Sequence, residues 1–371
     1  MTSLPRTSLP RPRSSRNVLP PWLGARVLGA AALAFALSLA PATRAAEPDL
    51  SGVSLTIGIQ SSGNSIATAL LEASGVFEDT PYKLTWANFD GANAAVEALH
   101  AGAIDLDVGL NFSTPVLNQA NASRPWTAED RPYVIVGANL QLNRAGTAIV
   151  VRPNAGIGSI KDLAGKTVSF AKGTANHYFF AIAAENAGLD LADVNLALMP
   201  LSEARAAFVG GSVDALVTAV SNARPLITSG DGIVLATSEG LYDNYSWFVA
   251  RPEVLRDPAR EAAVADILVR LQKAAVWQSR NLDRVTEIFA KTGRQKPQDA
   301  ALNAAESISA YVPIDAGVIA ANRSQAEVFR KAGVTTTGID AAIGFDDRFN
   351  AVIAANPGPG AAEARSRGSA N

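Results

Sequence analysis

The chain has 371 residues, of which 48% are hydrophobic and 18% charged, and it contains no cysteine. This length is enough for two domains with sizeable cores, because domains usually contain about 100–200 residues. Without cysteine, an exported chain relies on its core rather than on disulfides, and it has no thiol to which a lipid could be attached. The composition therefore excludes a disulfide scaffold and a lipid-anchored protein.

The first 45 residues have the layout of a secretory signal peptide. Five arginines precede an apolar run over residues 27–40, VLGAAALAFALSLA, and Thr43-Arg44-Ala45 follows. The run is too short for a membrane span, so we expect cleavage near Ala45 or Ala46 and a periplasmic protein. Removing the six arginines of residues 1–45 leaves 26 basic against 34 acidic residues, a net charge of −8. Such a chain is a poor binder of nucleic acid, and it can hold an anion only with local donors.

Strands and helices alternate through the first part of the predicted mature chain. The pattern predicts a strand over 55–59, a helix over 65–72, a strand over 83–89, a helix over 92–100, a strand over 104–109 and a polar turn over 111–115. Gly102 lies just past the second helix, where glycine is a usual C-terminal stop. Strands that alternate with helices of about ten residues indicate parallel βαβ units.

A second block of the same kind begins at Thr147. It predicts strands over 148–151, 167–170, 196–200 and 213–217, a helix over 177–187, and a helix capped by Ser202. A strand over 246–250 precedes long amphipathic helices over 257–291, 297–308 and 314–333, and residues 356–371 are predicted to be disordered. We therefore predict an α/β fold with two lobes and a cleft between them. The first lobe comprises 46–144 and 245–355, with a helical C-terminal region, and the second comprises 145–244.

The segment 159–177, SIKDLAGKTVSFAKGTANH, joins a short helix, a turn at Gly165, a strand and a small polar loop that opens the next helix. A loop of Gly173, Thr174 and Asn176 before a helix leaves the first backbone N–H groups of that helix without partners. With the positive end of the helix dipole, those donors form a site for a small anion.

This segment resembles the periplasmic substrate-binding proteins of sulfonate, taurine and nitrate ABC importers. Further pieces follow the family pattern in order and at the right spacing, namely residues 83–105, 204–208 and 211–215. The resemblance implies a type II periplasmic binding fold whose two lobes close around a small anionic ligand. The closed form is then expected to dock on a membrane permease. We expect a monomer with no cofactor, no metal and no nucleic acid partner.

The resemblance implies four ligand-binding loops at strand ends. Their residues are Gln60, Ser61, Asn64 and Ser65 in the first, Asn111, Ser113 and Thr114 in the second, and Gly173, Thr174, Asn176 and His177 in the third. The fourth is the segment after Asp214, which includes Ser221, and Arg224 lies just beyond it. Relatives usually carry a Trp in the fourth loop, where this chain has residues 219–221, AVS, so we expect a more open pocket. Arg224 is a candidate cation for an anionic head group. His177 fits capping of its helix as well as contact with the ligand.

Alternative functions remain open at this point. Nitrate and thiamin pyrimidine precursors are ligands of related scaffolds, and an enzyme of thiamin pyrimidine synthesis shares the fold that the resemblance implies. The sequence contains no G-x-S-x-G, P-loop or H-E-x-x-H motif, so we predict a binding protein rather than an enzyme.

Overall fold

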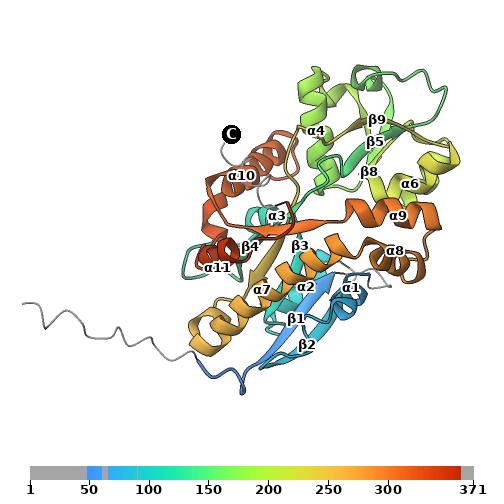
Figure 1. Ribbon diagram of the computed structural model, residues 1–371. Helices are drawn as coiled ribbons and strands as arrows, with labels where there is room; N and C mark the ends of the chain where they lie inside the picture. The colour runs from blue at the N-terminus through green and yellow to red at the C-terminus, as the bar shows by residue number, and fades with distance from the viewer. Residues whose placement is uncertain (1–47, 61–65, 90, 361–371) are drawn as a thin grey trace, which may run out of the picture. The chain divides into compact units, whose positions relative to one another are not determined.

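The computed structural model describes residues 48–60, 66–89 and 91–360. The predicted signal peptide, Ser61, Asn64, Ser65 and the last eleven residues of the predicted tail lie outside the described residues. Strands and helices alternate through most of the described chain (Figure 1). In order they are β1 (Ser54–Gln60), α1 (Ile66–Ser74), β2 (Lys83–Phe89), α2 (Ala92–His100), β3 (Leu106–Asn111), α3 (Thr114–Ala120), β4 (Val134–Gln141), β5 (Thr147–Val151), β6 (Thr167–Phe170), α4 (Ala175–Ala187), β7 (Asn195–Leu198), α5 (Leu201–Val209), β8 (Ala215–Ala219), α6 (Val220–Ser229), β9 (Ile233–Thr237), β10 (Tyr245–Ala250), α7 (Pro258–Arg280), α8 (Leu282–Lys291), α9 (Pro297–Glu306), β11 (Ser309–Val312), α10 (Ala316–Lys331) and α11 (Asn350–Ala355).

The strands form two separate sheets. One has the order β11-β4-β10-β3-β1-β2, and the other has the order β7-β6-β8-β5-β9. In the first sheet β1 is parallel to both β2 and β3, and in the second β6 is parallel to both β7 and β8. Because parallel strands end at the same edge, β1 and β3 bring two predicted loops together, and β6 and β8 bring together the other two.

The chain passes from one sheet to the other twice, between β4 and β5 and between β9 and β10. The predicted lobe boundaries at 144/145 and 244/245 lie in these two crossings. Contacts group the chain from Pro48 onward as one compact unit, and the division into two lobes stays a prediction.

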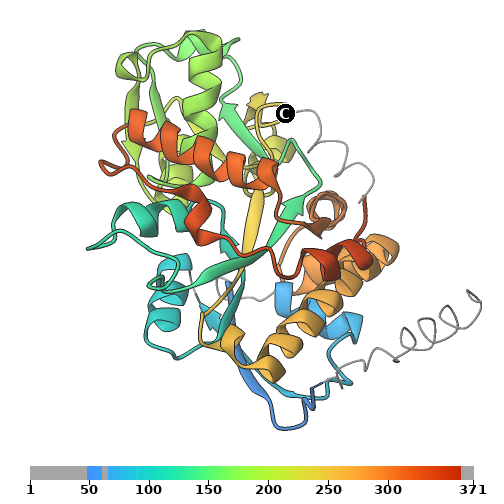
Figure 2. The same ribbon diagram turned by 90° about the vertical axis from the view of Figure 1, so that its left-hand side faces the viewer.

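Helices bury the faces of both sheets. α7 packs with α1 and with residues of β1, β3 and β10, among which Leu55, Ile57 and Phe248 are almost fully buried. α10 contacts both α3 and α4, so it connects elements that follow strands of different sheets (Figure 2). Capping carboxylates fix the starts of these long helices, since Asp257 accepts bonds from two N–H groups of α7 and Asp315 accepts one from α10.

The structure confirms most predicted elements and corrects several ends. β3 ends at Asn111, so the predicted strand over 104–109 is shifted by two residues. β8 covers 215–219 rather than 213–217, because the carboxylate of Asp214 turns back to accept the N–H of Thr167. Ser202 does not cap α5, which begins at Leu201 after Pro200.

Two features of the C-terminal region also differ from prediction. The helix predicted over 257–291 is two helices, because Asn281 leaves the helical backbone region (φ −125°, ψ 42°) and its amide bonds the carbonyl of Trp277. Residues 356–360, predicted to be disordered, lie against the body of the protein. The carbonyl of Asn356 accepts a bond from Gln272, and a Cβ at Gly358 would lie 2.7 Å from the Gln272 side chain.

Candidate functional site

The loop after β6 is held in place by its own glycine and histidine. Gly173 has φ +71°, in the left-handed region that glycine adopts at little cost, and its N–H donates to Nδ1 of His177 at 3.2 Å. The hydroxyl of Thr174 donates to the carbonyl of Ala171 at 2.8 Å. These bonds direct the chain into α4, where the N–H groups of the first turn have no acceptor within the helix.

His177 is buried and uncharged at neutral pH. Its side chain packs on Phe170 and on Phe329 of α10, with ring centroids 4.9 and 5.8 Å away. Burial and, to a smaller extent, the nearby charge of Lys172 together lower the pKa of the imidazole to about 4. His177 therefore stabilises the loop as a neutral hydrogen-bond acceptor, while Asn176 beside it is partly exposed.

Gly173 also connects this loop to the first sheet. A Cβ at Gly173 would lie 3.0 Å from Cδ1 of Leu117, and Leu117 belongs to α3, which begins where β3 ends. The predicted second and third loops, which come from different sheets, are therefore neighbours.

The end of β3 is bonded to itself and to α10. The Asn111 carbonyl oxygen Oδ1 accepts the N–H of Ser113, and the Ser113 hydroxyl accepts a bond from Nε2 of Gln325 at 2.9 Å. Ser113 and Thr114 are buried, whereas Asn111 is exposed. Of the three residues predicted here, Asn111 is thus the one whose side chain reaches solvent.

Gln60, at the end of β1, lies beside a carboxylate that the sequence analysis missed. Nε2 of Gln60 donates to Oδ1 of Asp107 at 3.4 Å, and Asp107 is fully buried in β3. Burial raises the pKa of Asp107 to about 7, and the bond from Gln60 opposes that shift only in part. A charged residue within the apolar sequence LDVGL was a signal that could have identified it.

The two ligand-binding residues predicted after β8 differ in their exposure to solvent. Ser221 is exposed in the first turn of α6, whereas Arg224 is buried and pairs with Glu306 of α9. Nε of Arg224 also donates to Oδ1 of Asn303 at 3.4 Å. The guanidinium is therefore bonded to α9 in this structure, and a role for Arg224 with an anionic ligand stays a prediction.

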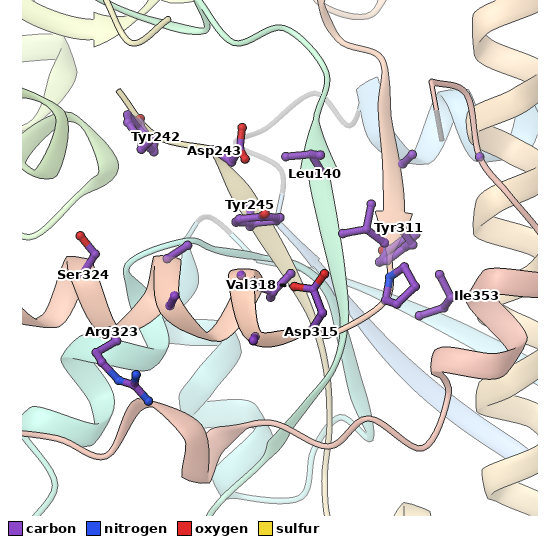
Figure 3. A pocket seen from close by; sticks show the side chains of 18 of the residues that line it. Leu140, Tyr242, Asp243, Tyr245, Tyr311, Asp315, Val318, Arg323, Ser324 and Ile353 are labelled. Carbon is purple, nitrogen blue, oxygen red and sulfur yellow. Dashed lines mark hydrogen bonds between the residues drawn. The ribbon is translucent and has the colours of Figure 1, made fainter. Parts of the chain in front are cut away.

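A cavity of about 840 Å³ lies apart from the predicted loops, between the residues just before β10, which connect the two sheets, and helix α10. Figure 3 shows Tyr242, Asp243 and Tyr245 on one side of it and Val318 and Ser324 of α10 on the other. The described residues that line this cavity include none of the predicted ligand-binding residues.

Within the described residues, no cluster of three His, Asp or Glu side chains is arranged to hold a metal ion. None of the described helices is long and apolar enough to cross a membrane.

Comparisons with known proteins are consistent with this geometry. The family described as NMT1/THI5 like matches residues 125–238. A protein of Escherichia coli (strain K12), assigned as an aliphatic sulfonates-binding protein, is 27% identical over 301 residues, which are 80% of this chain and 90% of that protein. This similarity confirms the resemblance to binding proteins of the aliphatic-sulfonate type that the sequence predicts.

Solved structures show the fold. The periplasmic aliphatic sulphonate binding protein SsuA from Escherichia coli superposes with a TM-score of 0.70 at 23% identity, covering 81% of this chain and 92% of that one. The alkanesulfonate-binding protein SsuA from Xanthomonas axonopodis pv. citri, bound to MOPS, gives 0.66 at 24% identity and covers 81% and 99%. The desulfurization enzyme DSZB gives 0.56 at 15% identity and covers 82% and 99%. The chain therefore has the two-sheet α/β fold of periplasmic binding proteins, and that fold also supports an enzyme.

Proposed function

We propose that this chain is the solute-binding component of an ABC importer that captures a small organic anion, an alkane- or arylsulfonate, and delivers it to a membrane permease. The proposal includes export to the periplasm through a cleaved leader, and action as a monomer without a cofactor. It is supported by similarity to a sulfonates-binding relative over 80% of this chain.

The neighbouring positions of Gly173 and Leu117 carry the proposal. The N-terminus of α4, which follows strand β6 of the second sheet, therefore lies close to the end of β3 in the first sheet. A sulfonate presents three oxygens that share one negative charge, and backbone N–H groups at a helix N-terminus bind such oxygens without a cationic side chain. This suits a protein whose predicted mature form has a net charge of −8.

A binding role fits the described residues of these loops better than a catalytic role. They offer amides, hydroxyls and backbone N–H groups, and the imidazole of His177 is already bonded to Gly173. Because the NMT1/THI5-like match keeps a thiamin pyrimidine precursor as an alternative ligand, the test includes a heterocycle as well as anions.

A thermal-shift panel tests the proposal on the chain from Ala46 onward. The panel holds ethanesulfonate, pentanesulfonate, benzenesulfonate, taurine, sulfate, nitrate and hydroxymethylpyrimidine. A ligand at about 100 times its dissociation constant stabilises the folded state by about 2.7 kcal/mol, which raises the unfolding midpoint measurably. We expect a rise with one class of sulfonate. A response to the pyrimidine alone would instead favour a thiamin-precursor function.

Asn176→Asp then locates the site. Asn176 is the second residue of α4, where a negative charge is favourable for the helix dipole, so the variant should remain folded while it repels the anion. We expect at least a tenfold loss of sulfonate affinity by calorimetry. Asn93→Asp is the matched control, since Asn93 is the exposed second residue of α2 and lies outside the predicted loops. Equal affinities of the two variants would exclude the α4 site.

A further inference from the structure

Asp107 is a buried carboxylate without a counter-charge in the described part of the protein. It is 0% exposed, and its Oδ2 has no hydrogen-bond partner among the described residues. The carboxylate packs so closely on β1 that a Cβ at Gly58 would lie 2.6 Å from Oδ2. An unpaired carboxylate in such a place is costly when ionised, so its protonated form is favoured.

The charged and titratable groups around Asp107 do not supply a cation. Asp105, two residues earlier, is itself paired with Arg260. Tyr133 and Tyr311 are buried, and the negative charge of Asp107 contributes to raising the pKa of both, so they stay neutral.

The elements that pack against β3 contribute no buried charged side chain beside Asp107. β1 and β10 contain no Asp, Glu, Lys, Arg or His from their first residue to their last. On α2, the charged or titratable side chains are Glu97 and His100, and both are exposed. Residues 61–65, SSGNS, which follow Gln60, contain no charged residue.

We propose that Asp107 is a positioning residue for Gln60, and that its protonation state sets how strongly the adjoining strand-end site binds an anion. The inference rests on the proposed function, because it assumes an anionic ligand at the end of β1. Its structural basis is the bond from Nε2 of Gln60 to Oδ1 of Asp107.

The charge of Asp107 and its hydrogen bond with Gln60 change the affinity for an anion in the same direction. An ionised Asp107 draws the NH₂ group of Gln60 toward itself and places a negative charge behind the site. A protonated Asp107 donates its O–H to Oε1 of Gln60 instead, which leaves the NH₂ group free to donate to an oxyanion. The site therefore binds an anion more tightly when Asp107 is protonated, and by linkage the bound anion makes Asp107 harder to ionise.

The test measures the dissociation constant of ethanesulfonate by calorimetry between pH 5.5 and 8.5, for the wild type and Asp107→Asn. Asparagine cannot ionise, and its NH₂ group donates to Oε1 of Gln60 as the protonated carboxyl does. We expect wild-type affinity to fall about tenfold as the pH rises, within the usual range of coupling between sites, and the variant to stay tight throughout. His100→Gln is the control that removes an exposed imidazole and should keep the wild-type profile.

A second measurement does not depend on any ligand. The carboxyl carbon of Asp107, assigned by NMR as the signal absent from Asp107→Asn, should titrate between pH 6 and 8. The same pH profile in wild type and Asp107→Asn, or a carboxyl that is already ionised at pH 5, would overturn the inference. If the carboxyl titrates as expected but no anion on the panel binds at any pH, the proposed function fails, and the coupling fails with it.

Discussion

The burial of the Asp107 carboxyl group should be measurable in how the free energy of unfolding of the whole protein depends on pH. Its folded pKa, about 7, lies above the ordinary value of 3.8. Between these values the folded state keeps a proton that the unfolded state has lost. The free energy of unfolding therefore decreases as the pH rises through this window, and it stops changing from this cause above about pH 7.

Asp107→Asn should remove this loss of stability. We expect the variant to be more stable than the wild type at pH 8 by up to about 4 kcal/mol, from a shift of about three pKa units. The advantage should disappear as the pH approaches 4. Urea unfolding at a series of pH values measures it, and parallel curves for the two proteins would show that Asp107 has a solvated or paired carboxyl in the folded state.

Gly173 is the second residue with a clear individual prediction. Gly173→Ala places a side chain at φ +71°, which costs roughly 1–2 kcal/mol, and also moves a Cβ to 3.0 Å from Leu117. Gly165→Ala is a matched control, since Gly165 has φ +70° and open space around a Cβ. Chemical denaturation should show a larger loss of stability at Gly173, and calorimetry should show weaker sulfonate binding only there. Equal losses at the two positions would mean that Leu117 moves aside freely.

At the scale of elements, the ion pair between Arg224 and Glu306 joins α6 to α9. The Arg224 side chain is 10% exposed and that of Glu306 is 32% exposed, so solvent screens the pair only in part. A double-mutant cycle with Arg224→Met and Glu306→Gln should give a coupling energy of about 1–2 kcal/mol in the free energy of unfolding. The pair of Lys331 with Glu185, which are 63% and 61% exposed, is the control and should give less than about 0.5 kcal/mol. A coupling as small as that of the control would show that α6 and α9 are docked by packing alone.

The same pair shows where prediction from sequence stops. Strands β1, β2 and β6 were predictable from two signals. Apolar and polar residues alternate within a strand, or glycines and polar loops lie at its two ends. The edge strand β11 has four residues, too few to show a period, and unlike β6 it does not lie between two nearby glycines. Arg224 and Glu306 are 82 residues apart, and no local pattern indicates that they meet. The loop at Gly173 was predictable because its conformation depends on neighbours within four residues, whereas the Gln60–Asp107 contact requires two strands to pair.

At the scale of the whole molecule, net charge should affect how fast an anion arrives. The predicted mature chain carries −8, which repels an anionic ligand at long range. The Debye length falls from about 30 Å at 0.01 M salt to about 3 Å at 1 M, so added salt screens this repulsion.

Stopped-flow measurement of protein fluorescence, with ethanesulfonate on the chain from Ala46, should therefore show an association rate that increases with salt. The dissociation rate should change little, because the bound anion is held by short-range bonds to backbone and amide donors. Sodium chloride and potassium chloride should give the same result, which controls for specific ion binding. An association rate that falls with salt would mean that a local positive potential at the site entrance outweighs the net charge, and Arg224 released from Glu306 would then be the first side chain to examine by substitution.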